Sequence, residues 1–168
     1  MKNTKILSID LGTHTGFAIS ANGIIESGSV DFSRYKGCKS KPADHIGGTF
    51  LSFDQWIKNV IPVFKIDCIV YESVMRWSSG DAAKIYGGLR GIMLSRAAKM
   101  GIPVYGYGVT HIKKFWTGKG NSKKPAMIAE TKKRYPGITL TGDDEADAIA
   151  ILHLHINQTN GTNEINTA

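Results

Sequence analysis

The first seventeen residues constrain the fold most, because an apolar run meets one acid and then a glycine-containing turn. Residues 6–9 are a short apolar stretch bounded by turn residues, which is typical of a strand buried on both faces. Asp10 follows at once, and burying a carboxylate is costly unless donors or a cation meet it. Gly12 and Gly16 would let a backbone, a phosphate or an ion come close. Asp10 is therefore either a strand-ending acid that accepts backbone hydrogen bonds or part of a charged site. Other acids that the fold brings close to Asp10 would decide between these two interpretations.

Length and composition indicate one globular domain. The chain has 168 residues, of which 42% are hydrophobic and 21% charged, enough to bury a sizeable core. It has no run of 18 apolar residues and no basic-then-apolar signal segment, so we expect no membrane association and a cytoplasmic location. Cys38 and Cys68 are too far apart to suggest a zinc site, and both are expected to be free thiols.

The charge is unevenly distributed. The net charge is +7, yet a dense acidic patch lies at residues 143–147. The basic stretches are residues 34–41, 113–124 and 132–134. A basic surface around a small acidic cluster suits a polyanionic partner that is handled at a metal-binding centre.

Sequence patterns predict a mixed α/β domain. Strands are expected at 5–11, 15–21 and 24–31, with Asn22-Gly23 as a hairpin turn, and two further buried strands at 66–72 and 102–107. A mobile basic loop at 33–48 precedes a helix from Thr49 that ends at Pro62. Further helices are predicted at 81–100, at 110–116, after a Ser122 cap to Tyr135, and from a cap at Asp143 to Ile156. A three-strand antiparallel meander followed by βα units, flanked by helices, forms a single domain over 1–156, with a disordered polar tail at 157–168. This is the element order of an RNase H-like domain.

Four acids are expected to converge. Glu72 ends a second buried strand as Asp10 ends the first, and Asp144 and Asp147 share one face of the last helix. The helix dipole explains acids in the first turn, but it explains Asp147 less well. Such an oxygen-only set can hold two Mg²⁺ ions, with Mn²⁺ as a substitute, and so activate a water for attack on a phosphodiester.

The chain resembles RuvC-type Holliday-junction resolvases, a family with phage and prophage members, over nearly its whole length. The matching segments are Ile9-Asp10-Leu11-Gly12-Thr13 with Gly16, Val70-Tyr71-Glu72, Gly87 to Gly91 with Arg90, Pro103-Val104-Tyr105, and Asp144-x-x-Asp147-Ala148-Ile149-Ala150. The resemblance implies an RNase H-like nuclease domain. It also implies a metal-dependent endodeoxyribonuclease that resolves Holliday junctions or related branched DNA by paired nicks from a homodimer. A phage-encoded member would act in the host cytoplasm.

The resemblance also implies site residues. The catalytic and metal-binding acids would be Asp10, Glu72, Asp144 and Asp147, and the catalytic lysines would be Lys113 and Lys124. DNA contacts are expected from Met75, Trp77, Arg90, Lys113, Lys114, Lys119, Lys123 and Lys124.

Among the remaining residues, His14 is a candidate phosphate contact. His153 and His155 are expected to be structural, and Trp116 is expected to anchor its short helix.

One position departs from the family pattern. Members of the family often carry an aromatic residue three positions after the strand acid, where it contacts bases at the crossover, whereas this chain has Met75, with Trp77 two residues on. Broader specificity for branched DNA therefore stays open. Three close glycines, Gly87, Gly88 and Gly91, suggest close packing against a helix, a second subunit or DNA.

Two other functions fit parts of the sequence. An actin-like or sugar-kinase-like ATPase could use the Asp10 turn as a phosphate-binding hairpin, but that fold needs two such domains. A non-catalytic DNA-binding module is the other alternative, and the presence of all four acids argues against it.

Overall fold

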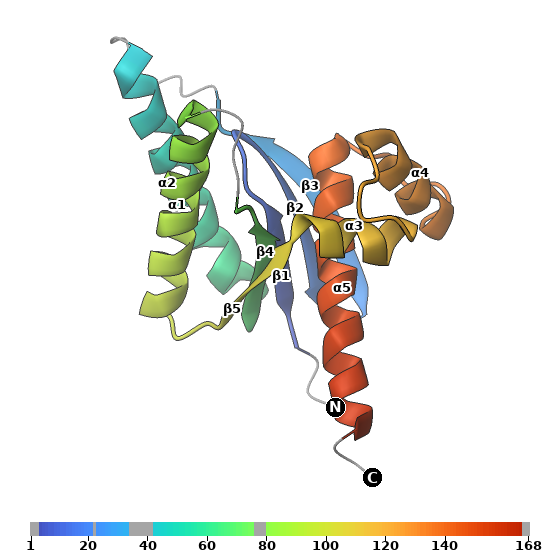
Figure 1. Cartoon of the computed structure of the whole chain (residues 1–168). Coiled ribbons are helices and arrows are strands. Elements are labelled where there is room, and N and C mark those ends of the chain that lie inside the picture. The colour runs from blue at the N-terminus through green and yellow to red at the C-terminus, as the bar shows by residue number, and fades with distance from the viewer. Residues whose placement is uncertain (1–3, 22, 34–41, 76–79, 166–168) are drawn as a thin grey trace.

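The computed structural model describes residues 4–21, 23–33, 42–75 and 80–165, with the side chains of 42–45 and 161–165 excepted (Figure 1). Cys38 and Trp77 lie outside this part of the chain. Among the described residues, no helix combines the length and the hydrophobicity needed to span a membrane.

A five-stranded mixed sheet forms the centre of the molecule. Its strand order is β3-β2-β1-β4-β5. The strands β1 (Ile6–Asp10), β2 (His14–Ala21) and β3 (Ile24–Asp31) form an antiparallel meander, as predicted. The strands β4 (Cys68–Ser73) and β5 (Val104–Gly108) run parallel to β1, because a helix crosses over before each of them.

Helices cover both faces of the sheet (Figure 1). The long helices α1 (Pro42–Phe64) and α2 (Gly80–Lys99) lie on one face. The helices α3 (Val109–Thr117), α4 (Lys124–Arg134) and α5 (Asp143–Ile165) lie on the other. Alternate residues of β1 and β4 enter the two cores: Leu7, Ile9, Ile69 and Tyr71 pack toward α1 and α2, whereas Ile6, Cys68 and Val70 pack toward α5. The apolar strands are therefore explained by burial on both faces.

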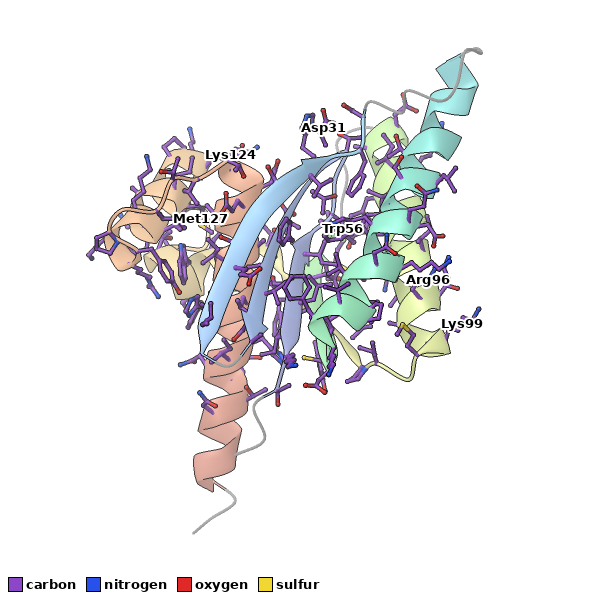
Figure 2. All side chains as sticks on the ribbon, turned by 180° about the vertical axis from the view of Figure 1, so that it is seen from behind. Asp31, Trp56, Arg96, Lys99, Lys124 and Met127 are labelled. Carbon is purple, nitrogen blue, oxygen red and sulfur yellow. The ribbon has the colours of Figure 1, made fainter. Side chains whose placement is uncertain are left out.

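The α1–α2 layer is held by an apolar stripe and one ion pair. Phe53, Ile57 and Ile61 of α1 are fully buried against the sheet, as the three- and four-residue spacing predicted. Arg96 of α2 donates from Nε to Asp54 Oδ1 of α1 at 2.6 Å. Figure 2 labels Arg96 on this side, and Lys124 on the side of α4.

Several predicted boundaries differ from the structure. The predicted loop at 33–48 is helical from Pro42, and α1 continues past Pro62 to Phe64. A proline this close to the C-terminus interrupts little of the helix, and the chain leaves it at Lys65, which has a φ of 54°. The last helix runs on to Ile165 rather than ending at Ile156, so the predicted tail is helical over 157–165.

Two further predictions are corrected. The strand β5 is an edge strand, not a buried one, and Tyr105 is 46% exposed; an apolar run does not reveal whether both of its edges are paired. Ser122 does not cap α4. Lys123 occupies that position without a side-chain cap bond, and Ser122 Oγ donates to the Lys119 carbonyl at 2.9 Å.

Candidate active site

Asp10 and Glu72 lie side by side at the ends of adjacent parallel strands. Ile9 of β1 is in register with Tyr71 of β4, so the next residue along each strand is one of the two acids. Because successive side chains alternate between faces, both acids face α5, opposite Ile9 and Tyr71. This confirms the expected neighbouring positions of the two strand acids.

The first turn of α5 is brought to the same place by a close backbone contact. Gly16 of β2 is the register partner of Asp10. A Cβ atom on Gly16 would lie 1.9 Å from the carbonyl oxygen of Asp144. Only glycine allows α5 to rest so closely on β2, and this contact places Asp144 next to Asp10. Farther along α5, Ser8 Oγ of β1 donates to the Ala148 carbonyl at 2.7 Å.

The four acids act on one another electrostatically. Burial, and then the charges of Glu72, Asp147 and Asp144, raise the pKa of Asp10 well above its usual value. Burial and Asp147 raise the pKa of Glu72 to about 7. Burial raises the pKa of Asp147 to about 6, and burial and Asp143 raise that of Asp144. The cluster thus carries more negative charge than its surroundings neutralise.

Two of the predicted lysines lie near these acids. The charge of Lys113 on α3 lowers the pKa values of Glu72 and Asp147. Lys124, at the start of α4, lowers those of the acids on α5 and of Asp10 and forms an ion pair with Asp143. The other predicted lysines, Lys114, Lys119 and Lys123, are exposed on the α3–α4 segment.

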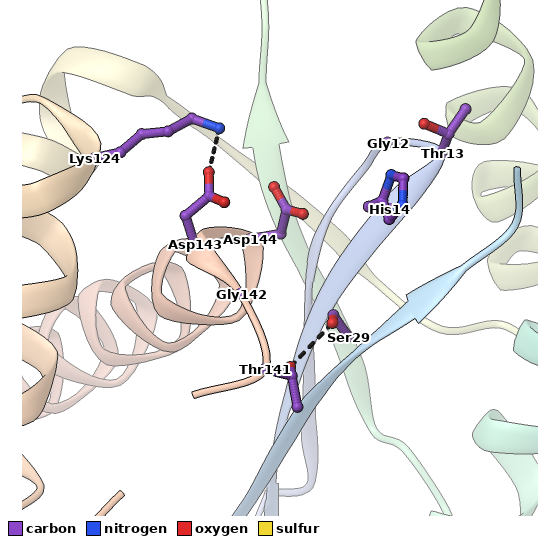
Figure 3. Close-up of a pocket in the computed structure, with 9 residues that line it drawn as sticks. All are labelled: Gly12, Thr13, His14, Ser29, Lys124, Thr141, Gly142, Asp143 and Asp144. Carbon is purple, nitrogen blue, oxygen red and sulfur yellow. Dashed lines mark hydrogen bonds and ion pairs between the residues drawn. The ribbon is translucent and has the colours of Figure 1, made fainter. Parts of the chain in front are cut away.

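A cleft of about 540 Å³ opens beside the acids (Figure 3). In Figure 3, Asp143 and Asp144 lie side by side on the first turn of α5, with Lys124 to one side and His14 across the cleft. The His14 Nε2 atom lies 3.5 Å from Asp31 Oδ1, and the charge of His14 lowers the pKa of Asp144. The lining residues are Gly12, Thr13, His14, Ser29, Lys124, Thr141, Gly142, Asp143 and Asp144.

Two further predicted DNA contacts, Arg90 and Met75, lie outside the α3–α4 segment. Arg90 is on α2, on the other face of the sheet, where its Nε donates to the Tyr71 hydroxyl at 2.9 Å and its guanidinium lies over the Tyr71 ring. Met75 follows β4 and is 88% exposed. Trp77 lies outside the described residues.

Sequence reasoning missed the clamp made by Tyr86. This buried α2 side chain donates from its hydroxyl to the Glu72 carbonyl at 2.9 Å and accepts from the Val74 N–H at 3.1 Å. It therefore fixes both the end of β4 that carries Glu72 and the start of the segment that carries Met75. No local pattern in the sequence singles out Tyr86 or identifies the partner of its hydroxyl.

Sequence reasoning also misjudged Glu145, which was interpreted only as a first-turn acid stabilised by the helix dipole. It is 3% exposed, and hydrogen bonds from Ser27 and Thr141 satisfy its carboxylate. The signal available in the sequence was its position between Asp144 and Asp147.

The histidines of α5 and Trp116 are structural, as expected. The Nδ1 atom of His155 lies 2.7 Å from the Tyr107 hydroxyl, and His153 is hydrogen-bonded to Tyr135. Trp116 is buried and donates from Nε1 to Thr131 Oγ1 at 3.0 Å, which joins α3 to α4. Cys68 is a buried free thiol.

The chemistry of the donor set fits hard divalent cations. Carboxylate oxygens are the ligands that Mg²⁺ and Mn²⁺ prefer, and the mutually raised pKa values mark negative charge that a cation would neutralise. Among the described residues, no group of three or more His, Cys, Asp or Glu side chains is arranged closely enough to hold an ion as it stands. Carboxylates that repel one another are expected to close up only around a cation.

A family model described as "Crossover junction endodeoxyribonuclease RuvC" matches residues 6–155. The chain belongs to the RuvC family. Relatives bearing that name include one from Ruegeria pomeroyi, 31% identical over 153 residues, and one from Sodalis glossinidius, 24% identical over 155 residues. Each comparison covers 90% of this chain and 90% of the relative.

Solved structures confirm the RNase H-like fold. Thermus thermophilus RuvC superposes with a TM-score of 0.67 at 21% identity, covering 91% of this chain and 93% of that one. The same protein in complex with a Holliday junction substrate gives 0.70 at 18% identity, covering 91% and 92%. The yeast mitochondrial Holliday junction resolvase Ydc2 gives 0.59 at 13% identity, covering 89% and 76%.

Proposed function

We propose that this RuvC family member is a metal-dependent endonuclease that cleaves Holliday junctions or related branched DNA. The observation that carries the proposal is the convergence of Asp10, Glu72, Asp144 and Asp147 from β1, β4 and α5, with their pKa values raised by burial and, for most of them, by one another. Family membership and the named activity of the relatives support the same function.

The four acids would hold two Mg²⁺ ions, with Mn²⁺ as a substitute. When bound, such ions lower the pKa of a water nucleophile and stabilise the leaving oxygen. The role of the chain is to present carboxylates from three rigid elements, so that a phosphodiester is held against fixed ligands rather than against mobile loops. No nucleophilic side chain takes part.

Lys113 and Lys124 would act on the scissile phosphate. Both lie near the acids, and a lysine ammonium neutralises a phosphate oxygen without competing for the cations. Lys124 is paired with Asp143, so DNA phosphate would compete with that carboxylate for its ammonium. The cleft lined by His14 and Lys124 continues the site toward β3.

The wider DNA surface would be the α3–α4 segment and the end of β4. Lys114, Lys119 and Lys123 are exposed there, and phosphate contacts of this kind make binding strongly dependent on salt. Met75 is exposed after the end of β4 and would contact a base at the crossover, and Trp77 is two residues away in sequence. The position of Arg90 on the opposite face favours a contact with a distant arm of the junction over one near the cut.

We also propose that the chain acts as a homodimer that makes paired nicks. Gly88 packs under the Phe50 ring of α1, where a Cβ atom would lie 2.1 Å from that ring. In contrast, a Cβ atom at Gly87 or Gly91 would meet no described atom within 4 Å. At these two positions the outer side of α2 therefore carries no side chain, which would allow a second copy of the chain to approach closely.

The test is a cleavage assay on labelled four-way, three-way, flap and linear duplex DNA, with Mg²⁺ and with EDTA. Branched substrates should be cut only with Mg²⁺. Asp10→Asn should keep the affinity for junctions and lose cleavage, because the variant removes a ligand and no phosphate contact. Binding without cleavage by the wild type would instead indicate a non-catalytic module.

A further inference from the structure

Glu145 is a buried acid whose side chain is bonded to a strand rather than to the active-site cluster. It lies between Asp144 and Asp147 on α5 and is 3% exposed. A carboxylate so deeply buried is tolerated only where donors satisfy it. Its partners are Ser27 on β3 and Thr141, just before α5.

Three donors reach the two carboxylate oxygens. Ser27 Oγ donates to Glu145 Oε1 at 2.7 Å. The backbone N–H and the hydroxyl of Thr141 both donate to Oε2 at 2.7 Å. Since the Thr141 hydroxyl has one proton and gives it to Glu145, the 3.0 Å bond between Thr141 and Ser29 has Ser29 as its donor. The donor and the acceptor of each hydroxyl hydrogen bond in this network are therefore assigned.

The network lies next to the contact that seats α5 on the sheet. Ser27 and Ser29 are two residues apart on β3, so their side chains share one face. Ser29 is the register partner of Gly16, and Gly16 lies under the Asp144 carbonyl. The bond from Ser27 to Glu145 and the bond from Ser29 to Thr141 therefore act on or next to the turn of helix that carries Asp144.

We propose that Glu145 is a positioning residue that latches the first turn of α5 to β3 and so holds Asp144 and Asp147 in place for the cations. This inference rests on the proposed function. Without the latch, Ser27 and Thr141 lose their acceptor, and the turn keeps the Gly16 contact and the Lys124–Asp143 ion pair but no bond from Glu145 to β3. Groups that orient metal ligands in this way typically change metal affinity about 10- to 100-fold when removed.

Three variants separate a latch from a catalytic charge. In Glu145→Gln, the amide can place its oxygen toward Thr141 and its NH₂ group toward Ser27, whose hydroxyl then accepts, so the latch survives without the charge. Glu145→Ala removes the latch, and Ser27→Ala removes one bond. Mn²⁺ affinity is measured by calorimetry on the full chain, alongside the Mn²⁺ concentration that gives half-maximal junction cleavage.

We expect Glu145→Gln to stay close to the wild type in both measurements. Glu145→Ala should weaken Mn²⁺ binding about tenfold, and Ser27→Ala should do so by less. Thr49→Val is the control, because it removes a buried bond to the Phe32 carbonyl on the other side of the sheet. It should lower the melting temperature without changing Mn²⁺ affinity.

The latch would be overturned if Glu145→Gln lost cleavage as completely as Asp144→Asn, or if Glu145→Ala bound Mn²⁺ with unchanged affinity. If Glu145→Ala does not fold, unchanged Mn²⁺ affinity in Ser27→Ala would overturn it instead. An equal loss of Mn²⁺ affinity in the control Thr49→Val would overturn it as well. If the wild type itself neither binds Mn²⁺ nor cuts branched DNA, the proposed function is refuted, which is a separate outcome.

Discussion

The Cα atom of Gly16 lies directly beneath the carbonyl oxygen of Asp144, so closely that a Cβ atom would be 1.9 Å from that oxygen. Because Gly16 is also the register partner of Asp10, this contact joins the first acid of the chain to the acids of the last helix. The spacing of the candidate active site therefore depends on the absence of a side chain at Gly16.

Gly16→Ala should lower cleavage by about 100-fold or more, since α5 must move away from β2 and a displacement of about 1 Å can cost that much. Overpacking should also destabilise the protein by about 1–3 kcal/mol. Single-turnover cleavage and thermal unfolding measure the two effects. The control is Gly47→Ala on α1, where no described atom lies within 4 Å of the added Cβ and cleavage should be unchanged. Equal activity in both variants would show that the close contact is not needed.

Tyr86→Phe should slow cleavage and lower the melting temperature. The Glu72 carbonyl and the Val74 N–H both lose their partner, and an unsatisfied buried group costs about 1–3 kcal/mol. The matched variant is Tyr107→Phe, which removes a tyrosine hydroxyl bonded to His155 at the sheet edge. It should affect stability and leave single-turnover cleavage unchanged. A similar cleavage rate in the two variants would count against a clamp on Glu72.

In EDTA, Glu72→Gln should become more stable than the wild type as the pH rises. The folded pKa of Glu72 is about 7, above its ordinary 4.5, so the folded wild type binds more protons and loses stability between those values. At pH 4 the two proteins should melt alike, whereas at pH 7.5 the variant should melt several degrees higher. Comparing the two proteins removes the opposite contribution of His153 and His155, whose pKa values are lowered by burial. A constant difference across this range would contradict the raised pKa.

The exposed Met75 predicts weak discrimination between four-way junctions and other branched DNA. Methionine offers apolar bulk without an aromatic face, and stacking of a base on an aromatic ring is worth about 1–3 kcal/mol. Met75→Phe should sharpen the four-way preference, and Trp77→Ala should weaken whatever preference exists. Cleavage of four-way and three-way substrates by the three proteins is the measurement. Strong wild-type preference that neither variant changes would assign selectivity to dimer geometry alone.

Light scattering at micromolar concentration should give about twice 18.3 kDa. Gly91→Arg adds bulk to the outer side of α2 and should give a folded monomer that makes single nicks instead of paired ones. Gly47→Arg, on the exposed side of α1, should remain dimeric. A wild type that stays monomeric with and without DNA would remove the paired-nick mechanism.

The sequence by itself determined the strands and most helices, and it singled out the four candidate acids. Apolar runs and helical spacing are local, and each acid stands at a fixed distance from a strand end or on a helix face. The hairpin turn before β3 and the order of elements were enough to place Asp10 beside Glu72 on neighbouring strands.

Only the tertiary structure decided how α5 and the end of β4 are held there. The contact between Gly16 and Asp144, the bond from Ser27 to Glu145 and the Tyr86 clamp all join separate elements of the chain, and no local pattern records a partner. The same reason explains the errors. The edge position of β5, which the apolar run predicted to be buried, follows from strand order, which a single run of residues does not contain.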